Sequence, residues 1–375
     1  MTRIASVLAL ALVIVGLAWM DAPTVARGDA VRWSSFAELQ RPRAFASAIG
    51  LPSGEILVLG GLDPRDADVT NPRTELIDQF SGSVALLPQT ILARLLQTVT
   101  LGAGERVVVA GGVVWEGPRW APVARVDVYE VARRSWRAAA PLHSARSDAA
   151  AAALKDGRVA VFGGNFGTRL LDTVEIYDPR RDAWTEGAPM PRPRTQHSAV
   201  LLKDGRVLIA GGIDKDGGPT ATTFLYDPSA NAWTAGPLMT QPRMQQSTVL
   251  LANGDVLFAG GDDAAASTSE LFLASEGRFV ASGALQHPRF VAQAAALPDG
   301  RVVLNGGLPP HMTTYAPLGS TEIWDPRTGK WREVAPAASP RAWAKLISIE
   351  DAVFLVSGSG PGEDAVSSVE RLTLD

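Results

Sequence analysis

A repeated pattern of glycine and arginine runs through the chain and constrains its fold more than any other feature. Each unit has a glycine pair, an arginine 17 residues before the first glycine, and a large apolar residue ten residues before that arginine. The last unit keeps only Gly358-Ser359 at the position of the pair. Seven units follow one another, each about 50 residues long. The aligned arginines are Arg43, Arg94, Arg146, Arg194, Arg243, Arg289 and Arg341.

Each unit contains signals for four strands, here called a to d. Strand a starts at the arginine, and strand b follows a turn such as residues 203–206 and ends at the glycine pair. Strand c is typified by residues 174–177, and Asp178-Pro179 turns the chain into strand d at Trp184. Short apolar runs separated by Gly, Pro and Asp indicate strands joined by tight turns. The pattern therefore predicts an all-β chain of four-stranded units.

The double glycine, the Tyr177-Asp178-Pro179 sequence and the Trp184 that follows resemble the kelch repeat. The resemblance covers residues 31–375 and implies a β-propeller, a fold with 4–8 four-stranded blades. We therefore expect an all-β, seven-bladed kelch β-propeller that forms a single domain. Kelch propellers serve as enzymes, adaptors and binding modules, so the resemblance does not name the function.

The two ends of the described repeat are expected to share one blade. After Arg341 the sequence supplies strands a, b and c, but no strand d before Asp375. Trp33 lies ten residues before Arg43, the interval that separates strand d from the next arginine in the other units. The N-terminal strand should therefore complete the last blade, which removes two exposed sheet edges.

Residues 1–30 resemble a secretory signal peptide. Arg3 precedes an apolar run over residues 4–20, and small residues predict cleavage after Ala26 or Ala30. We expect a periplasmic or secreted protein with no membrane span after cleavage; an uncleaved membrane anchor is the alternative. The chain has no cysteine, so disulfides and a lipid-modified N-terminal cysteine are excluded.

Composition excludes some further classes. The net charge is −4 without a basic region, which argues against nucleic-acid binding. Kelch-type copper radical oxidases use a tyrosine crosslinked to cysteine, and the absence of cysteine excludes that chemistry. Asp63, Asp66 and Asp68 resemble only a fragment of a calcium loop, as do Asp214 and Asp216. No catalytic triad or phosphate loop is recognisable, so we expect no metal and no cofactor, and catalytic residues remain unknown.

In the sequence alignment, all length variation lies between the glycine pair and the strand-c aromatic residue. That interval runs from 12 residues (Gly260 to Phe272) to 18 residues (Gly111 to Tyr129). In an up-and-down blade, the b–c loops and the arginine before strand a share one face. Variable loops on a rigid scaffold favour this face as the binding surface.

An acidic residue stands two positions before the strand-c aromatic in six units, at Glu75, Asp127, Glu175, Glu270, Glu322 and Glu370. A repeated ion pair with the arginine is one interpretation, because unpaired arginine charges close together repel each other. The resemblance implies another, since arginines at this position bind carboxylates in some kelch propellers. Phe224 replaces the acid in one unit. The arginine without a partner should be Arg194 if pairs form within a blade, or Arg243 if they cross blades.

We therefore predict a ligand site near these two arginines. The candidate ligand-binding residues are Arg194, Arg243, Gln196, His197, Gln245 and Gln246, with the loop aromatics Trp115, Trp120 and Tyr315. The leading hypothesis is an exported, monomeric binding module for an acidic small molecule, a glycan or a protein partner. One alternative is a carbohydrate-active enzyme similar to the exported kelch epimerases (mutarotases) of sialic acid, using an Arg with a Glu or His. Another is a structural or interaction protein of the cell surface.

Overall fold

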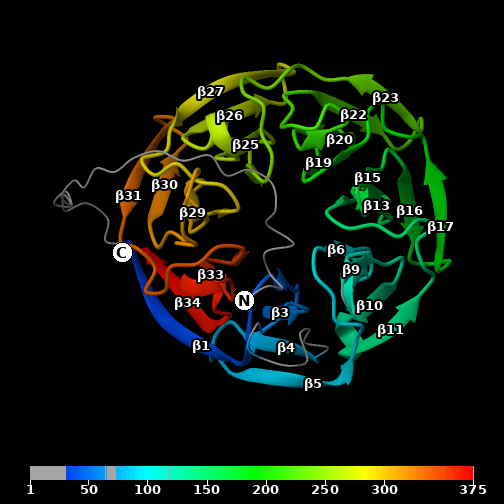
Figure 1. Cartoon of the computed structure of the whole chain (residues 1–375). Coiled ribbons are helices and arrows are strands. Elements are labelled where there is room, and N and C mark those ends of the chain that lie inside the picture. Colours follow the sequence, from blue (N-terminus) through cyan, green and yellow to red (C-terminus); the bar gives the residue numbers. More distant parts are fainter. Residues whose placement is uncertain (1–30, 64, 66–72, 118, 375) are drawn as a thin grey trace.

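The chain forms a ring of seven four-stranded antiparallel sheets, seen along its axis in Figure 1. The structure is a computed structural model that describes residues 31–63, 65, 73–117 and 119–374. The predicted all-β, seven-bladed propeller is confirmed. The predicted signal peptide lies outside the described residues. No helix in the described part is long and apolar enough to cross a membrane.

The innermost strand of each blade is strand a, and strand d forms the outer rim. In that order the blades are β2 (Ser47–Gly50), β3 (Glu55–Leu59), β4 (Arg73–Asp78), β5 (Val84–Thr90); β6 (Thr98–Gly102), β7 (Arg106–Ala110), β10 (Val126–Glu130), β11 (Ser135–Ala139); β12 (Ala150–Ala153), β13 (Val159–Phe162), β16 (Val174–Asp178), β17 (Ala183–Gly187); β19 (Ser198–Leu201), β20 (Val207–Ala210), β22 (Thr223–Asp227), β23 (Ala232–Ala235); β24 (Ser247–Leu250), β25 (Val256–Ala259), β26 (Thr268–Leu273), β27 (Arg278–Ala284); β28 (Gln293–Ala296), β29 (Val302–Asn305), β30 (Thr321–Asp325), β31 (Lys330–Val334); and β32 (Lys345–Ile349), β33 (Ala352–Val356), β34 (Val366–Leu374), β1 (Val31–Arg43). Strand a begins four residues after each arginine and not at it, so that the arginine belongs to the link between blades.

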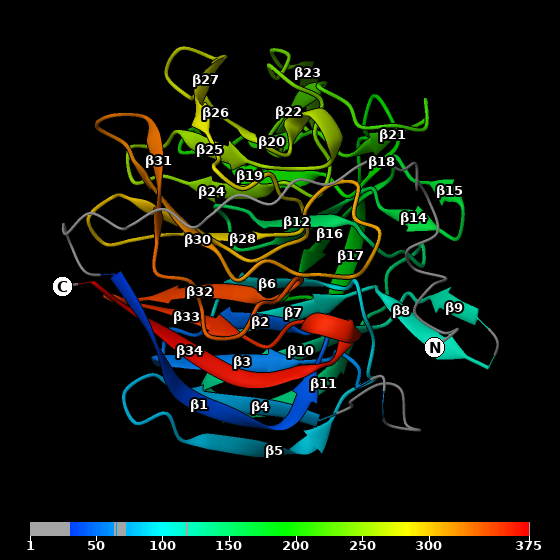
Figure 2. The ribbon, with the colours of Figure 1, turned by 60° about the vertical axis from the view of Figure 1, so that its left-hand side comes forward.

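Short hairpins and single 3₁₀ turns complete the chain. Several b–c loops carry small two-stranded pairings, and Figure 2 shows those formed by β8, β9, β14 and β15 on one side of the ring. These elements are β8 (Val113–Glu116), β9 (Arg119–Pro122), β14 (Asn165–Phe166), β15 (Arg169–Leu170), β18 (Arg194–Thr195), β21 (Ile213–Asp214), η1 (Val131–Arg133), η2 (Asp263–Ala265) and η3 (Pro361–Glu363).

The hydrophobic core lies between neighbouring blades. Phe162 in β13 packs against Tyr226 in β22 of the next blade, with ring centroids 5.7 Å apart. Strand b is covered by a neighbouring blade on each face, and all four residues of β13 and of β20 are buried. The sequence of strand b is therefore a continuous apolar run instead of an alternating one.

The first and last segments of the described chain close the ring together. β1 is the outermost strand of the blade formed by β32, β33 and β34, and it pairs antiparallel with β34 (Figure 2). Trp33 stands opposite Leu372, and its indole Nε1 donates a hydrogen bond of 2.8 Å to Thr321 Oγ1 in the preceding blade. The predicted closure is confirmed.

The glycine pair is the joint between one blade and the next. Gly307 N–H donates to the carbonyl of Arg341 in the following blade, over 3.0 Å. A Cβ on Gly306 would lie only 2.3 Å from the same carbonyl oxygen, and both glycines have a positive φ. Only glycine meets both requirements without strain.

The last blade corrects the sequence alignment. Gly358, and not Ser359, donates its N–H to the carbonyl of Arg43, and Arg341 donates to the carbonyl of Ser357. The structural equivalent of the glycine pair is therefore Ser357-Gly358, one residue earlier than the sequence alignment predicts. The a–b turn is one residue shorter here, so this turn also varies in length. Ser357 adopts the left-handed φ of 54° that glycine has elsewhere.

Candidate functional site

Six of the seven repeat arginines form buried ion pairs within their own blade. The side chains of each pair are 3% exposed or less. The shortest nitrogen-to-oxygen distances are Arg43–Glu75 2.6 Å, Arg94–Asp127 2.8 Å, Arg146–Glu175 2.5 Å, Arg243–Glu270 2.5 Å, Arg289–Glu322 2.7 Å and Arg341–Glu370 2.5 Å. The acids of the sequence pattern are thus the partners of the arginines.

Each pair also fastens loops together. Arg289 Nη1 donates to the carbonyls of Gly306 and Ser320, at the two ends of the b–c loop. Glu322 accepts the backbone N–H groups of Gln286 and His287 from the link before strand a. The pair therefore ties the inter-blade link to the b–c loop of the same blade.

Arg194 is the exception, one of the two alternatives that the sequence leaves open. Its guanidinium lies 4.9 Å from the ring centroid of Phe224, a cation–π arrangement. Nη1 donates to the carbonyls of Gly211 and Thr222, whereas Nε has no partner among the described residues. Burial lowers the pKa of Arg194 to about 10, opposed by the negative charge of Asp214. Pairing across blades, the alternative that would have left Arg243 unpaired, does not occur.

Ligand contact by Arg194 or Arg243 stays a prediction without an exposed group to support it. Both residues are 0% exposed. Arg243 is in addition held by Glu270, as described above. The spacing of the repeat gives the position of each arginine along the chain, but it does not indicate the direction in which the side chain points.

A ring of seven residues with left-handed backbone lies two residues after the arginines. Their φ angles run from 47° to 56°, and we call them the mouth ring: Phe45, Leu96, Asp148, Gln196, Gln245, Val291 and Trp343. Consecutive members hydrogen-bond across blades, from Asp148 N to Leu96 O and from Gln196 N to Asp148 O, and onward to Gln245 and Val291. A β-branched residue such as Val291 rarely adopts such a φ. Backbone of this kind occurs preferentially at functional sites.

The mouth ring has a polar arc and an apolar arc. Asp148, Gln196 and Gln245 are neighbours in the chain of hydrogen bonds and form the polar arc. On the other side, the rings of Phe45 and Trp343 lie with centroids 4.7 Å apart. All five side chains are half-buried. The site therefore offers amides and a carboxylate opposite an aromatic surface.

The loop aromatics predicted from the sequence reach the apolar arc. Trp120 packs in one cluster with Phe45, and Tyr315 stacks on Trp343 with planes inclined by only 2°. Trp115 stands opposite Trp120 in the β8–β9 hairpin, with ring centroids 5.2 Å apart. Trp120 and Tyr315 thus contact mouth-ring residues, and Trp115 is connected to them through Trp120.

His197 and Gln246 lie beside the polar arc and inside the protein. Both ring nitrogens of His197 lack a partner among the described residues, and the residue is 8% exposed. Burial, together with the charge of Arg194, lowers the pKa of His197 to about 3, so the imidazole is neutral. Gln246 Nε2 donates to Ser198 Oγ, whereas its Oε1 has no such partner. These unsatisfied groups mark this part of the site as atypical of a protein interior.

Phe45, Asp148 and Trp343 were not among the residues predicted from the sequence. The signal for them was present, because each occupies the position two residues after a repeat arginine. Comparison of this position across the seven units would have grouped all three with Gln196 and Gln245.

Asp148 provides a pH-dependent test of this geometry. Burial raises the pKa of Asp148 to about 6, although a hydrogen bond with Ser147 opposes the shift. An unfolded Asp titrates near 4, so its contribution to folding is favourable below pH 4 and is lost as the pH rises through 6. Asp148→Asn should therefore raise the free energy of unfolding by about 1–2 kcal/mol at pH 7.5 and change it little at pH 4.

Urea denaturation at the two pH values measures this difference. The lowered pKa of His197 also makes the folded protein less stable at acidic pH. This effect is the same in both proteins and cancels in the comparison. An equal effect of Asp148→Asn at pH 7.5 and pH 4 would contradict the raised pKa.

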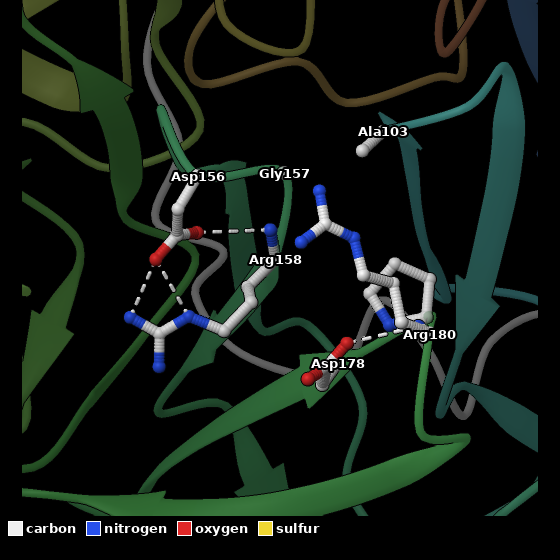
Figure 3. A pocket seen from close by; sticks show the side chains of 7 residues that line it. Ala103, Asp156, Gly157, Arg158, Asp178 and Arg180 are labelled. Atoms are coloured by element: carbon white, nitrogen blue, oxygen red, sulfur yellow. Dashed lines mark hydrogen bonds and ion pairs between the residues drawn. The ribbon is translucent and has the colours of Figure 1, made fainter.

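The opposite face carries a hollow formed by turns between strands. Ala103, Gly157 and Pro179 are among its lining residues, and its volume is about 210 Å³ (Figure 3). Asp156 and Arg158 within it form an ion pair of 2.7 Å. The same pair recurs in two other a–b turns, between Asp204 and Arg206 and between Asp299 and Arg301. These charges therefore stabilise turns.

The acidic fragments of the sequence do not form a metal site in the described part of the chain. No three His, Asp or Glu side chains converge there. Asp214 and Asp216 both pair with Arg192. Asp66 and Asp68 lie outside the described residues.

Comparison with known families agrees with this architecture. The kelch motif model matches residues 146–191 and 193–240, within the blades that begin with strands β12 and β19. These two segments are kelch repeats, and the seven-bladed ring that contains them is a kelch-type β-propeller. In this kelch propeller the matched segments include the Arg146–Glu175 pair and the exceptional Arg194.

A solved structure shares the fold. It is a fungal alcohol oxidase of the AA5 family in complex with copper, with 20% sequence identity and a TM-score of 0.70. The alignment covers 92% of the kelch propeller and 75% of the oxidase chain. At this identity the similarity shows the fold alone, and the oxidase activity belongs to that protein. A search of curated proteins found no match.

Proposed function

We propose that this kelch propeller is an exported binding module that holds a carbohydrate on the mouth ring. The observation that carries the proposal is the division of the ring into a polar and an aromatic arc. A pyranose has hydroxyl groups around its edge and C–H groups on its faces. It could therefore hydrogen-bond to one arc while a face packs on the other. Export rests on the predicted signal peptide.

The polar arc supplies groups that suit hydroxyl ligands. A hydroxyl both donates and accepts, and it can pair with an amide of Gln196 or Gln245 or with the Asp148 carboxylate. Gln196 Oε1 has no partner among the described residues, and the structure records no side-chain hydrogen bond for Gln245. Gln196 Oε1 is buried, so its side chain must rotate to present this oxygen to a ligand, whereas the half-buried Gln245 amide gives up no recorded hydrogen bond on binding.

An acidic ligand held by the repeat arginines has less support. Six of the guanidinium groups are already neutralised by a buried carboxylate, and Arg194 lies against Phe224. The same burial weakens the enzyme alternative, because an Arg–Glu pair inside a blade does not meet a substrate. A neutral or weakly charged glycan is the better match for the half-buried amides and aromatic rings of the mouth ring.

Gln245→Ala should weaken glycan binding about tenfold without loss of stability. The side chain makes no recorded hydrogen bond in the protein, so its removal affects mainly the ligand, and a lost hydrogen bond of about 1–1.5 kcal/mol corresponds to that factor. Trp343→Phe should also weaken binding, because it reduces the stacking surface. The measurement is a glycan-array screen of residues 31–375, followed by titration calorimetry on the best glycan.

Phe80→Ala is the matched control. Phe80 is 74% exposed in a c–d turn on the opposite face, so its loss should change neither affinity nor melting temperature. Wild-type affinity in both Gln245→Ala and Trp343→Phe would place the binding site elsewhere on the molecule.

A further inference from the structure

Asp148 is the only charged residue of the mouth ring. The other six members are Phe45, Leu96, Gln196, Gln245, Val291 and Trp343. The ring therefore carries one negative charge and no positive charge. A cationic group on the ligand meets an opposite charge there, whereas an anionic group meets a like charge.

The Asp148 carboxylate has no ion pair in the part of the chain that the structure describes, in contrast to the acids of the six Arg–acid pairs. Burial raises its pKa to about 6, and a hydrogen bond with Ser147, not a cation, opposes this shift. At pH 7.5 the group is still mostly ionised. A half-buried anion without a counter-charge is unfavourable, which makes it a candidate for a cation supplied by a ligand.

The repeat gives Asp148 the same backbone setting as the aromatic members of the ring. Phe45, Asp148 and Trp343 have φ angles of 56°, 50° and 51°. In each of the three blades, the preceding residue forms a β-bridge with the residue that follows the glycine pair or its equivalent. Equivalent backbone directs the Cα–Cβ bond in the same way relative to its own blade. The carboxylate therefore belongs to the same face as the two aromatic rings.

Gln196 adds an acceptor next to Asp148. Its backbone N–H donates to the Asp148 carbonyl over 3.1 Å, so the two residues are neighbours in the ring. Its Oε1 has no partner among the described residues and can reach a ligand by rotation of the side chain. An ammonium group donates up to three hydrogen bonds and accepts none. The carboxylate and this amide oxygen are both acceptors and match such a group.

The aromatic arc also tolerates a positive charge. The rings of Phe45 and Trp343 lie 4.7 Å apart between centroids, and Tyr315 stacks on Trp343. The faces of aromatic rings carry negative potential and attract cations. They pack equally well on the C–H groups of a sugar. Both arcs of the ring therefore favour a ligand that combines a sugar with a positive charge.

We propose that the polar arc binds a primary ammonium group through the Asp148 carboxylate, so that the sugar on the mouth ring is an amino sugar with a free amine. This inference rests on the carbohydrate site proposed above and names the class of sugar. The ammonium supplies the counter-charge that Asp148 lacks, in a charge-assisted hydrogen bond. The sign of the ligand charge is opposite to that of the acidic ligand suggested by the arginine pattern.

The first experiment compares chitotriose with cellotriose, which has a hydroxyl group in place of each amine. Titration calorimetry at pH 7 measures binding to the protein. Chitotriose should bind at least tenfold more tightly than cellotriose. Asp148→Asn should abolish this preference. Glu186→Gln should retain it, because it removes an exposed charge from the outer strand β17. Equal affinities of the two sugars for the wild-type protein, or an undiminished preference in Asp148→Asn, would overturn the proposal.

A second experiment separates the charge from the sugar. Cyclohexylamine and cyclohexanol share a six-membered ring and differ in the ammonium group. NMR titration should show at least a fivefold preference of the wild-type protein for the amine and none in Asp148→Asn. If this preference is found but no glycan binds, the cation site stands and the carbohydrate function fails. If glycans bind but neither amine is preferred, the cation site fails and the carbohydrate function stands.

Discussion

Arg289→Met is expected to lower the free energy of unfolding by about 3–5 kcal/mol, because it leaves Glu322 charged and unpaired inside the blade. The substitution keeps the apolar stem of the side chain and removes its guanidinium. Burial of the carboxylate without a counter-charge is then the dominant cost. Urea denaturation followed by tryptophan fluorescence provides the measurement.

Arg194→Met is the matched control within the same chain. It removes a guanidinium that makes equivalent hydrogen bonds to the b–c loop carbonyls. It leaves no acid behind, since Phe224 occupies the position of the acid. We expect its cost to be smaller than that of Arg289→Met by about 2 kcal/mol. Equal losses in the two variants would mean that the ion pair itself adds nothing beyond the loop hydrogen bonds.

Deletion of residues 31–38 should destabilise the whole ring by at least 4 kcal/mol. The deletion removes most of the recorded pairing between β1 and β34, and with it Val31 and Trp33 from the core between two blades. Loss of a fully buried aromatic side chain costs about 3–5 kcal/mol; Trp33 is half-buried and contributes part of this, and the lost strand pairing adds to it. Because β34 would become an exposed edge, aggregation on heating is also expected.

A protein that begins at Val31 is the control for that deletion. It lacks residues 1–30 but keeps all of β1, so it should melt at the same temperature as the full chain. Differential scanning calorimetry of the three proteins tests the expectation. If the protein without residues 31–38 melted like its control, the pairing of β1 with β34 would not be what holds the ring closed.

The repeat made the architecture predictable. Two features recur in the units: glycines that lie close to a carbonyl of the next blade, and an acid at a constant distance from an arginine. They recur because each blade packs against its neighbour in the same way. Phe224 stood out for the same reason and limited the unpaired arginine to Arg194 or Arg243, between which the structure decided. Such patterns can be recognised in the sequence because the same contact requires the same residue type in successive blades.

The sequence by itself determined the seven blades, the closure by Trp33 and its strand, and the recurrence of an acid at a constant distance from the arginine in six of the units. Only the tertiary structure decided that the arginines point into their blades, that six of them pair with the acid of the same blade, and that the residues two positions later form the mouth ring. The reason is geometric. Spacing along a strand sets which residues share a side, whereas burial and neighbours across blades depend on how the ring closes in space.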